Sequence, residues 1–208
     1  MRSIRMPMVG TVLAALLGTA AAPAVAAPPP PPELAKVRQE LTELKVAPQN
    51  NKAGYSRKKF PHWSSVDAQC TTREHVLKRD GENVRTGADC YPTAGRWFSV
   101  YDEKWVSNPS DATIDHFIPL ANAWRSGAHA WDNTKRGKFA NDLNSPQLVV
   151  ATGRSNQDKG DRGPEDWKPA NTGYWCTYAK SWVHVKHVWG LSITSAEKTA
   201  INSMLGRC

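Results

Sequence analysis

The sequence of 208 residues lacks the features that mark several classes of non-globular protein. Charged residues make up 22% of the chain and hydrophobic residues 40%, which excludes a disordered polyelectrolyte, a coiled coil and a collagen-like repeat. No internal repeat is present, and no second long apolar run follows the one near the N-terminus. These absences exclude a multispanning membrane protein and predict a single globular domain.

Acidic residues are also scarce, with 19 Asp and Glu against 27 Lys and Arg. Arg2 and Arg5 precede an apolar run over residues 8–22, and the small residues 24–26 follow it. This pattern predicts a secretory signal peptide over residues 1–26 and a secreted, extracellular protein. Its removal leaves 25 basic and 19 acidic residues, a formal charge of +6, which favours polyanionic partners without choosing among them.

Cysteine is rare, and its spacing favours disulfides over a zinc ion held by all four thiolates. The four cysteines are Cys70, Cys90, Cys176 and Cys208, and no close Cys-x-x-Cys pair is present. In an oxidising compartment they predict two disulfides, for which three connectivities exist. Proximity in the sequence favours Cys70 with Cys90 and Cys176 with Cys208.

Composition divides the remaining chain into two parts. Residues 27–50 are predicted to form a Pro-rich linker and a short amphipathic helix. Pro28 to Pro32 predict a stiff extended spacer that holds the domain away from what precedes it, and apolar residues at helical spacing predict the helix within 33–45. Residues 51–208 are predicted to form the domain itself. All nine tryptophans lie beyond position 62, which favours core packing over a glycan-binding face.

The pattern of the domain predicts an α+β fold. Strands are expected over residues 97–100, 113–117 and 147–151. Helices are expected over residues 120–126, 135–140 and 174–189, and a last helix begins with the capping box Thr194 to Glu197 and runs to residue 205.

The candidate chemistry lies around the second predicted strand. Asp115 and His116 stand shortly before Pro119, and Asn156 and Lys159 follow the third strand on a predicted short helix. A histidine near neutral pKa can act as a general base, and carboxylate and amide oxygens suit Mg²⁺. Lys159, on the same helix face as Asn156, would touch the phosphate. The set predicts metal-assisted phosphodiester hydrolysis.

One geometric condition accompanies this prediction. Neighbouring residues on a regular strand point to opposite faces, so Asp115 and His116 share a site only at a bulge or at a strand end. Pro119, just downstream, makes such an irregularity plausible.

These motifs resemble those of a known family. Residues 115–120, 123–128, 139–142 and 156–160, followed by Trp167, are similar to the exported HNH-type nucleases of actinobacteria and fungi. The resemblance extends upstream to Tyr55 and downstream to Cys208. It implies a ββα-metal (HNH, or His-Me finger) core embedded in helices, and a secreted endonuclease activity.

The resemblance also implies roles for single residues. His116 corresponds to the general base, and Asp115 and Asn156 correspond to the ligands of a divalent metal, with Mg²⁺ first and Mn²⁺ or Ca²⁺ as alternatives. The residue that orients the base is usually an Asn before the second strand, but Gln147 stands there. Gln147 can accept the imidazole N–H through its longer arm, and Asn144 is an alternative. Asn141 is a further one.

Other basic and histidine residues have weaker assignments. A phosphate-binding rim is predicted from Arg73, Lys135, Arg136, Lys138, Arg154 and Arg162. His184 and His187 lie three apart on a predicted helix, but without a nearby carboxylate they are interpreted as surface or packing residues rather than metal ligands.

Together these observations predict a secreted, metal-dependent endonuclease with a histidine general base that acts on DNA, with RNA as a second candidate substrate. The expected partner is the nucleic acid substrate alone, with no membrane, and the chain is expected to be a monomer. The alternative is an exported, basic, non-catalytic module that binds nucleic acid or another polyanion. That module would bind in a salt-sensitive way without needing a metal.

Overall fold

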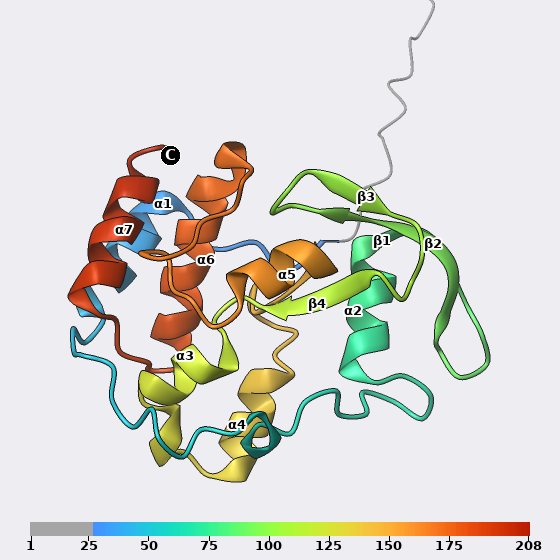
Figure 1. Cartoon of the computed structure of the whole chain (residues 1–208), viewed down its shortest axis with the longest axis horizontal. Coiled ribbons are helices and arrows are strands. Elements are labelled where there is room, and N and C mark those ends of the chain that lie inside the picture. Colours follow the sequence, from blue (N-terminus) through green and yellow to red (C-terminus); the bar gives the residue numbers. More distant parts are fainter. Residues whose placement is uncertain (1–26) are drawn as a thin grey trace, which may run out of the picture.

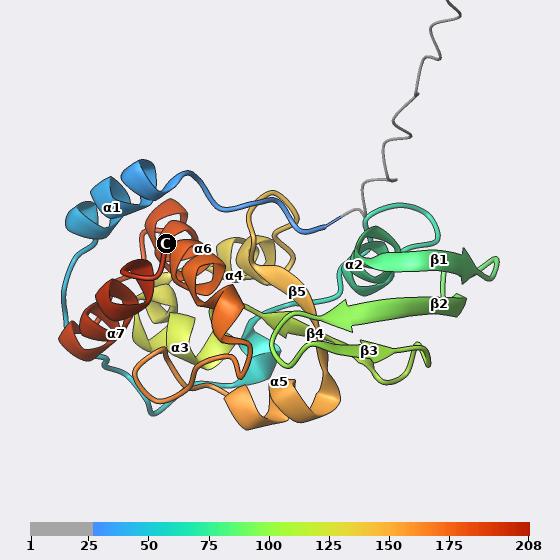
Figure 2. The same cartoon turned by 90° about the horizontal axis from the view of Figure 1, so that it is seen from above.

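The structure is a computed structural model that describes residues 27–208, so the predicted signal peptide lies outside the described residues. Figures 1 and 2 show helices α1, α6 and α7 gathered at one end and a three-stranded sheet with α2 at the other, with β4, β5 and α5 between them. Among residues 27–208, no helix has the length and apolar character needed to cross a membrane.

The element order confirms the α+β class and most of the predicted elements. The helices are α1 (Leu34–Glu43), α2 (Thr72–Asp80), α3 (Leu120–Arg125), α4 (Asn133–Ala140), α5 (Gly153–Lys159), α6 (Trp175–Val188) and α7 (Ser195–Leu205). The 3₁₀ turns are η1 (Arg57–Lys59), η2 (Ala128–Ala130) and η3 (Thr172–Tyr174). The strands are β1 (Gly81–Thr86), β2 (Pro92–Ser99), β3 (Lys104–Val106), β4 (Ala112–His116) and β5 (Leu148–Thr152). The predicted capping box at the start of α7 is present, with both Thr194 and Glu197 in place.

Strands β4 and β5 and helix α5 form the ββα unit that the sequence predicts. The two strands pair antiparallel from Ala112↔Thr152 to His116↔Leu148 without a register shift. All five residues of β5 are buried, as expected for a strand covered on both faces. Helix α5 starts at the residue after β5, which places its start beside the start of β4. It then runs along β4, so that Asn156 contacts Thr113 and Lys159 contacts Asp115.

Tryptophans supply much of the interior, as the sequence predicts. A large hydrophobic cluster joins α1, α3, α4, α6 and α7 and contains Trp124, Trp167 and Trp182, and a smaller one joins α2, β2, β4 and β5 around Trp97. Trp105 is the exception, because 46% of it is exposed.

The three-stranded sheet contains elements that periodicity did not predict. Strands β1, β2 and β3 pair antiparallel in that order, and α2 packs against β2. Helix α2 buries few apolar side chains, so its helical period is weak. Its start is nevertheless marked in the sequence by the capping box of Thr71 and Glu74.

Both predicted disulfides are present. Cys70 bonds to Cys90, which ties the start of α2 to the β1–β2 turn, and Cys176 bonds to Cys208, which ties α6 to the end of α7.

The segment before the domain packs against it. Helix α1 lies on α6, and Val46 forms a parallel bridge with Ile193. Residues 28–31 line one wall of a cavity of about 430 Å³ whose other walls include Phe98 and Tyr174. The proline segment therefore lies along the domain, and because what precedes it lies outside the described residues, its predicted role as a spacer stays a prediction.

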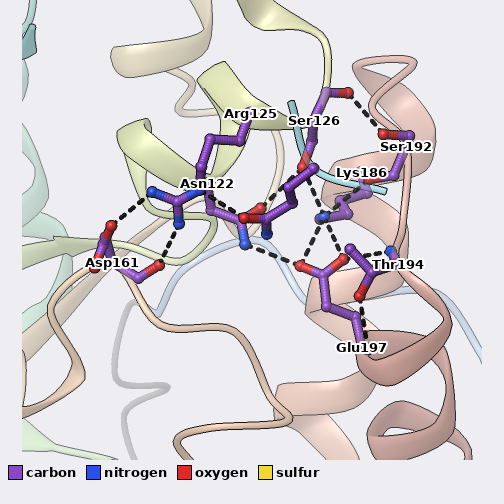
Figure 3. A network of polar contacts seen from close by, with 9 residues as sticks. Asn122, Arg125, Ser126, Asp161, Lys186, Ser192, Thr194 and Glu197 are labelled. Carbon is purple, nitrogen blue, oxygen red and sulfur yellow. Dashed lines mark hydrogen bonds and ion pairs between the residues drawn. The ribbon is translucent and has the colours of Figure 1, made fainter. Parts of the chain in front are cut away.

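A buried polar network, which we call the Lys186–Glu197 network, joins α3 to α6 and α7 (Figure 3). Both side chains are fully buried, and their charged groups lie 2.9 Å apart. Glu197 also accepts hydrogen bonds from the side chain of Asn122 and the backbone of Thr194. Lys186 donates to Ser126 as well. The network fixes the position of α3, which begins four residues after His116.

Candidate active site

A cavity of about 510 Å³ opens at the end of β4. It is lined by Lys52, Tyr55, Arg57, Ile114, Asp115, His116, Pro119, Ala121, Arg125, Asn156, Gly160 and Asp161. The lining comes from the loop before and within η1, from β4, from α3 and its preceding residue, and from α5 and the residues after it. The three residues predicted to carry the chemistry, Asp115, His116 and Asn156, thus meet at one cavity.

His116 is the last residue of β4, so the strand end, and not a bulge, brings it beside Asp115. Its ring is buried, and Nε2 lies 2.9 Å from the carbonyl oxygen of Ala140, the last residue of α4. A carbonyl can only accept, so Nε2 carries the proton and Nδ1 is left as the unprotonated nitrogen. The backbone of α4 therefore sets the tautomer of the candidate base.

The surroundings keep this imidazole neutral. Burial lowers the pKa of His116 to about 3, the hydrogen bond with the Ala140 carbonyl acts in the opposite direction, and the nearby guanidinium of Arg57 lowers the pKa further. A neutral imidazole with a free Nδ1 is the form that accepts a proton.

The indole of Trp63 covers the His116 ring. The two ring centroids lie 5.4 Å apart with an interplanar angle of 32°. Trp63 has a φ of 60°, in the left-handed region that is strained for such a residue, and strain of this kind concentrates at functional sites. Asn141 holds the segment in place, because its side chain accepts from the backbone of Ser64 and donates to the carbonyl of Pro61.

Asp115 is held by two buried donors. Its Oδ2 accepts from the hydroxyl of Tyr101 at 2.7 Å and lies 2.7 Å from Nζ of Lys159. Lys159 also donates to the carbonyl of His116 at 3.0 Å. Within residues 27–208, Oδ1 of Asp115 receives no hydrogen bond, and this oxygen is therefore the one left for a ligand in the cavity.

The amide of Asn156 is oriented by a neighbour on β4. Thr113 donates its hydroxyl proton to the carbonyl of Ala151, so its oxygen accepts from Nδ2 of Asn156 at 3.2 Å. Because the amide nitrogen of Asn156 donates to Thr113, the amide oxygen is the atom that can accept a ligand in the cavity.

The donor set fits a hard divalent cation. A carboxylate oxygen of Asp115 and an amide oxygen of Asn156 line the same cavity without competing protein donors, and Mg²⁺ is typically held by one or two such oxygens together with waters and substrate phosphates. Among the described residues, no group of three or more His, Cys, Asp and Glu side chains is arranged to hold a metal. The chemistry of the set thus matches an ion that takes most of its ligands from water and phosphate.

The predicted role of Gln147 is wrong. Gln147 is buried, and its amide pairs with the backbone of Ile118, accepting from the N–H and donating to the carbonyl at 3.0 Å each. It fixes the loop after β4, while the carbonyl of Ala140 takes the proton of His116. Asn144, the alternative, is exposed, and among residues 27–208 its side chain makes no hydrogen bond, while its backbone N–H donates to Asp142.

Two of the predicted phosphate-binding residues are also corrected. Lys159 is fully buried and bonded to Asp115 and the His116 carbonyl, so it does not reach a phosphate. Arg136 is 9% exposed and gives its guanidinium to backbone carbonyls, including that of Lys59 at 2.9 Å, and to Asn133. Arg154 is exposed on α5 but does not line the cavity.

The exposed cations at the cavity come instead from the segment before α2. Lys52 and Arg57 line it and are exposed. Arg125 lines it too but pairs with Asp161 at 2.6 Å and with the side chain of Gln49. The sequence resemblance includes Arg57, yet nothing in the local pattern showed that η1 would lie opposite β4.

His184 and His187 have carboxylates beside them, which the interpretation from the sequence did not expect. His184 lies 3.1 Å from Glu40, and His187 lies 2.7 Å from Glu43. Both glutamates come from α1, more than a hundred residues earlier in the chain.

Comparisons with known proteins identify the family of the chain. Residues 72–204 match the family described as GmrSD restriction endonucleases, C-terminal domain. A protein of Arthroderma benhamiae (strain ATCC MYA-4681 / CBS 112371) named "Uncharacterized secreted protein" is 53% identical over 168 residues, which cover 81% of this chain and 82% of the relative. This relative confirms the predicted export, so the chain is a secreted protein. No solved structure matches the chain. With a family match over more than half of its length, the chain belongs to the C-terminal domain family of the GmrSD restriction endonucleases, which is of the HNH nuclease type.

Proposed function

We propose that this protein is a secreted, metal-dependent endonuclease that hydrolyses phosphodiester bonds of DNA, with His116 as general base. The observation that carries the proposal is the meeting of Asp115, His116 and Asn156 at one cavity, with Nε2 of His116 committed to the Ala140 carbonyl. Membership of a nuclease family supports the same reaction. RNA carries the same phosphodiester group and is the second substrate to test.

Different residues at the cavity have different roles in the proposed reaction. Nδ1 of His116 removes a proton from the water that attacks phosphorus, and the Ala140 carbonyl holds the ring in the tautomer that permits this. Arg57 and Lys52 face the cavity as exposed cations and bind the phosphates on either side of the bond to be cleaved. Trp63 limits the access of water to the other face of the imidazole.

Asp115 and Asn156 are the residues that would hold the divalent cation. When bound, such an ion supplies positive charge that offsets the negative charge growing on the phosphoryl and leaving oxygens. Tyr101 and Lys159 hold Asp115 so that Oδ1 is presented to the cavity. Thr113 does the same for the amide oxygen of Asn156.

The test is cleavage of supercoiled plasmid by the mature, disulfide-bonded protein with Mg²⁺ or Mn²⁺, beside an EDTA sample and a structured RNA. We expect metal-dependent nicking that is lost in His116→Ala, since positioned general bases contribute about 10²- to 10⁴-fold. His75→Ala is the matched control, because His75 is exposed on α2 and does not line the cavity.

Near wild-type cleavage by His116→Ala would contradict the assignment of the base. Salt-sensitive plasmid binding with no cleavage under either cation would instead favour the non-catalytic polyanion-binding module.

A further inference from the structure

The charges around the cavity do not favour a free cation. Among the lining residues, Arg125 and Asp161 pair with each other. The remaining charged side chains are Asp115 and the two exposed cations, Lys52 and Arg57. A phosphate group is attracted to such a site, whereas a divalent cation that arrives alone meets a net positive field.

The single carboxylate of the donor set is itself neutralised. Nζ of Lys159 lies 2.7 Å from Oδ2 of Asp115, and the lysine is 0% exposed. A buried ion pair is screened far less than one in water. The ion pair therefore offsets most of the negative charge with which Asp115 would attract a cation. Oδ1 still faces the cavity and can coordinate an ion that is held there by other ligands as well.

Lysine at this position does more than orient Asp115, although it also donates a hydrogen bond to the His116 carbonyl. The hydroxyl of Tyr101 already donates to the same Oδ2 and would orient the carboxylate without adding charge. Lys159 is 0% exposed, and a charged group removed from water in this way carries a desolvation cost that a neutral donor would avoid. The affinity of oxygen-ligand sites for divalent cations depends on the number of charged ligands, so this cation bears directly on metal affinity.

We propose that Lys159 sets the metal affinity of the site: by neutralising Asp115 it keeps the affinity of the free protein for a divalent cation low, so that the ion is held together with a phosphate of the nucleic acid. The inference rests on the proposed nuclease function and goes beyond it by making metal and substrate binding interdependent. Because linkage is reciprocal, the metal raises the affinity for nucleic acid by the same factor.

The first test measures Mn²⁺ binding to the free protein by electron paramagnetic resonance, with no turnover involved. Lys159→Met removes the charge and keeps most of the side-chain volume, and we expect it to bind Mn²⁺ about tenfold more tightly than wild type, because a nearby positive charge is gone. A purely structural role for Lys159 predicts weaker binding. Equal or weaker binding by the folded variant would overturn the inference.

Two control variants separate charge from the loss of a contact. Tyr101→Phe removes a donor to the same carboxylate without changing charge, and Lys78→Met removes the charge of an exposed lysine on α2 that does not line the cavity. We expect neither to tighten Mn²⁺ binding. A gain in either control equal to that of Lys159→Met would show that charge at residue 159 is not the cause, and would overturn the inference.

A second measurement does not depend on the folding of Lys159→Met. Mn²⁺ affinity is determined for His116→Ala, which is expected not to cleave, with and without a short DNA duplex. The inference predicts that the duplex tightens Mn²⁺ binding about tenfold or more, as expected for a typical coupling free energy. An unchanged affinity would refute it while leaving metal-dependent plasmid cleavage, and so the proposed function, intact. No Mn²⁺ binding in any sample would refute both.

Discussion

Breaking the Lys186–Glu197 network by Lys186→Met should strongly destabilise the fold. The substitution leaves the carboxylate of Glu197 fully buried without its cation, and with only Asn122 and the backbone of Thr194 as donors. Removing one partner of a buried ion pair costs about 3–5 kcal/mol of unfolding free energy. For a domain with a total stability of about 5–15 kcal/mol this is a large fraction.

Two more variants separate the loss of unfolding free energy into the contribution of the charges and the contribution of the hydrogen bonds. Glu197→Gln leaves Lys186 as the unmatched charge and should cost about as much. The double variant with Lys186→Met has no buried charge left, so it should be less destabilised than either single variant, with about 1–3 kcal/mol remaining for imperfectly paired polar groups.

The assay is urea unfolding followed by tryptophan fluorescence with the disulfides intact. Trp182, fully buried on the same helix as Lys186, is one reporter of the transition. The slope of unfolding free energy against urea must stay constant among the variants for the comparison to hold. Single variants that each lose less than about 1 kcal/mol, or a double variant whose loss equals the sum of the two, would refute the view that charge compensation stabilises this network.

Three further predictions concern the loop, a disulfide and pH. Gln147→Leu leaves two buried backbone groups of the loop after β4 without partners, so urea unfolding should show a loss of about 2–4 kcal/mol, and plasmid cleavage should fall; a neutral result would show that water replaces the amide. Replacing Cys176 and Cys208 by Ala, which opens a bond spanning 32 residues, should lower stability by about 3 kcal/mol, and an unchanged melting temperature would contradict this. The hydrogen bond from Arg125 lowers the pKa of Asp161, so the ion pair contributes stability above the unfolded-state pKa and loses it as pH falls through the lower folded-state value. Because the Asp161 side chain is 59% exposed, Asp161→Asn should cost only about 0.5 kcal/mol near neutral pH, and the same loss persisting in strong acid would contradict the assignment.

Local sequence signals were sufficient for much of the fold and for the centre of the candidate site. The short run of residues 113–117 predicted β4, the capping box at Thr194 predicted the start of α7, and sequence proximity predicted both disulfides. Each of these depends on residues that are close together in the chain. The meeting of Asn156 with Asp115 was also predictable, because a helix that directly follows β5 must start beside β4.

The incorrect predictions concern residues whose roles depend on contacts with distant parts of the chain. Lys159 and Arg136 carry the charge that suits phosphate, but long cationic side chains bury equally well against a carboxylate or backbone carbonyls. The group that orients His116 is a backbone carbonyl of Ala140, which no side-chain motif records. Arg57 reaches the cavity only because a segment before α2 folds across β4.

The placement of Lys52 and Arg57 limits how short a recombinant fragment of this protein can be. The family match begins at residue 72 and ends at residue 204, so a recombinant fragment with those limits would omit the cationic wall of the cavity, the indole over His116 and helix α1. It would also omit Cys70 and Cys208 and leave Cys90 and Cys176 as unpaired thiols, open to wrong pairing in an oxidising compartment. The folded unit that contains the candidate site is therefore longer than the shared family domain at both ends, and the additional residues line the cavity, cover His116 or complete the two disulfides.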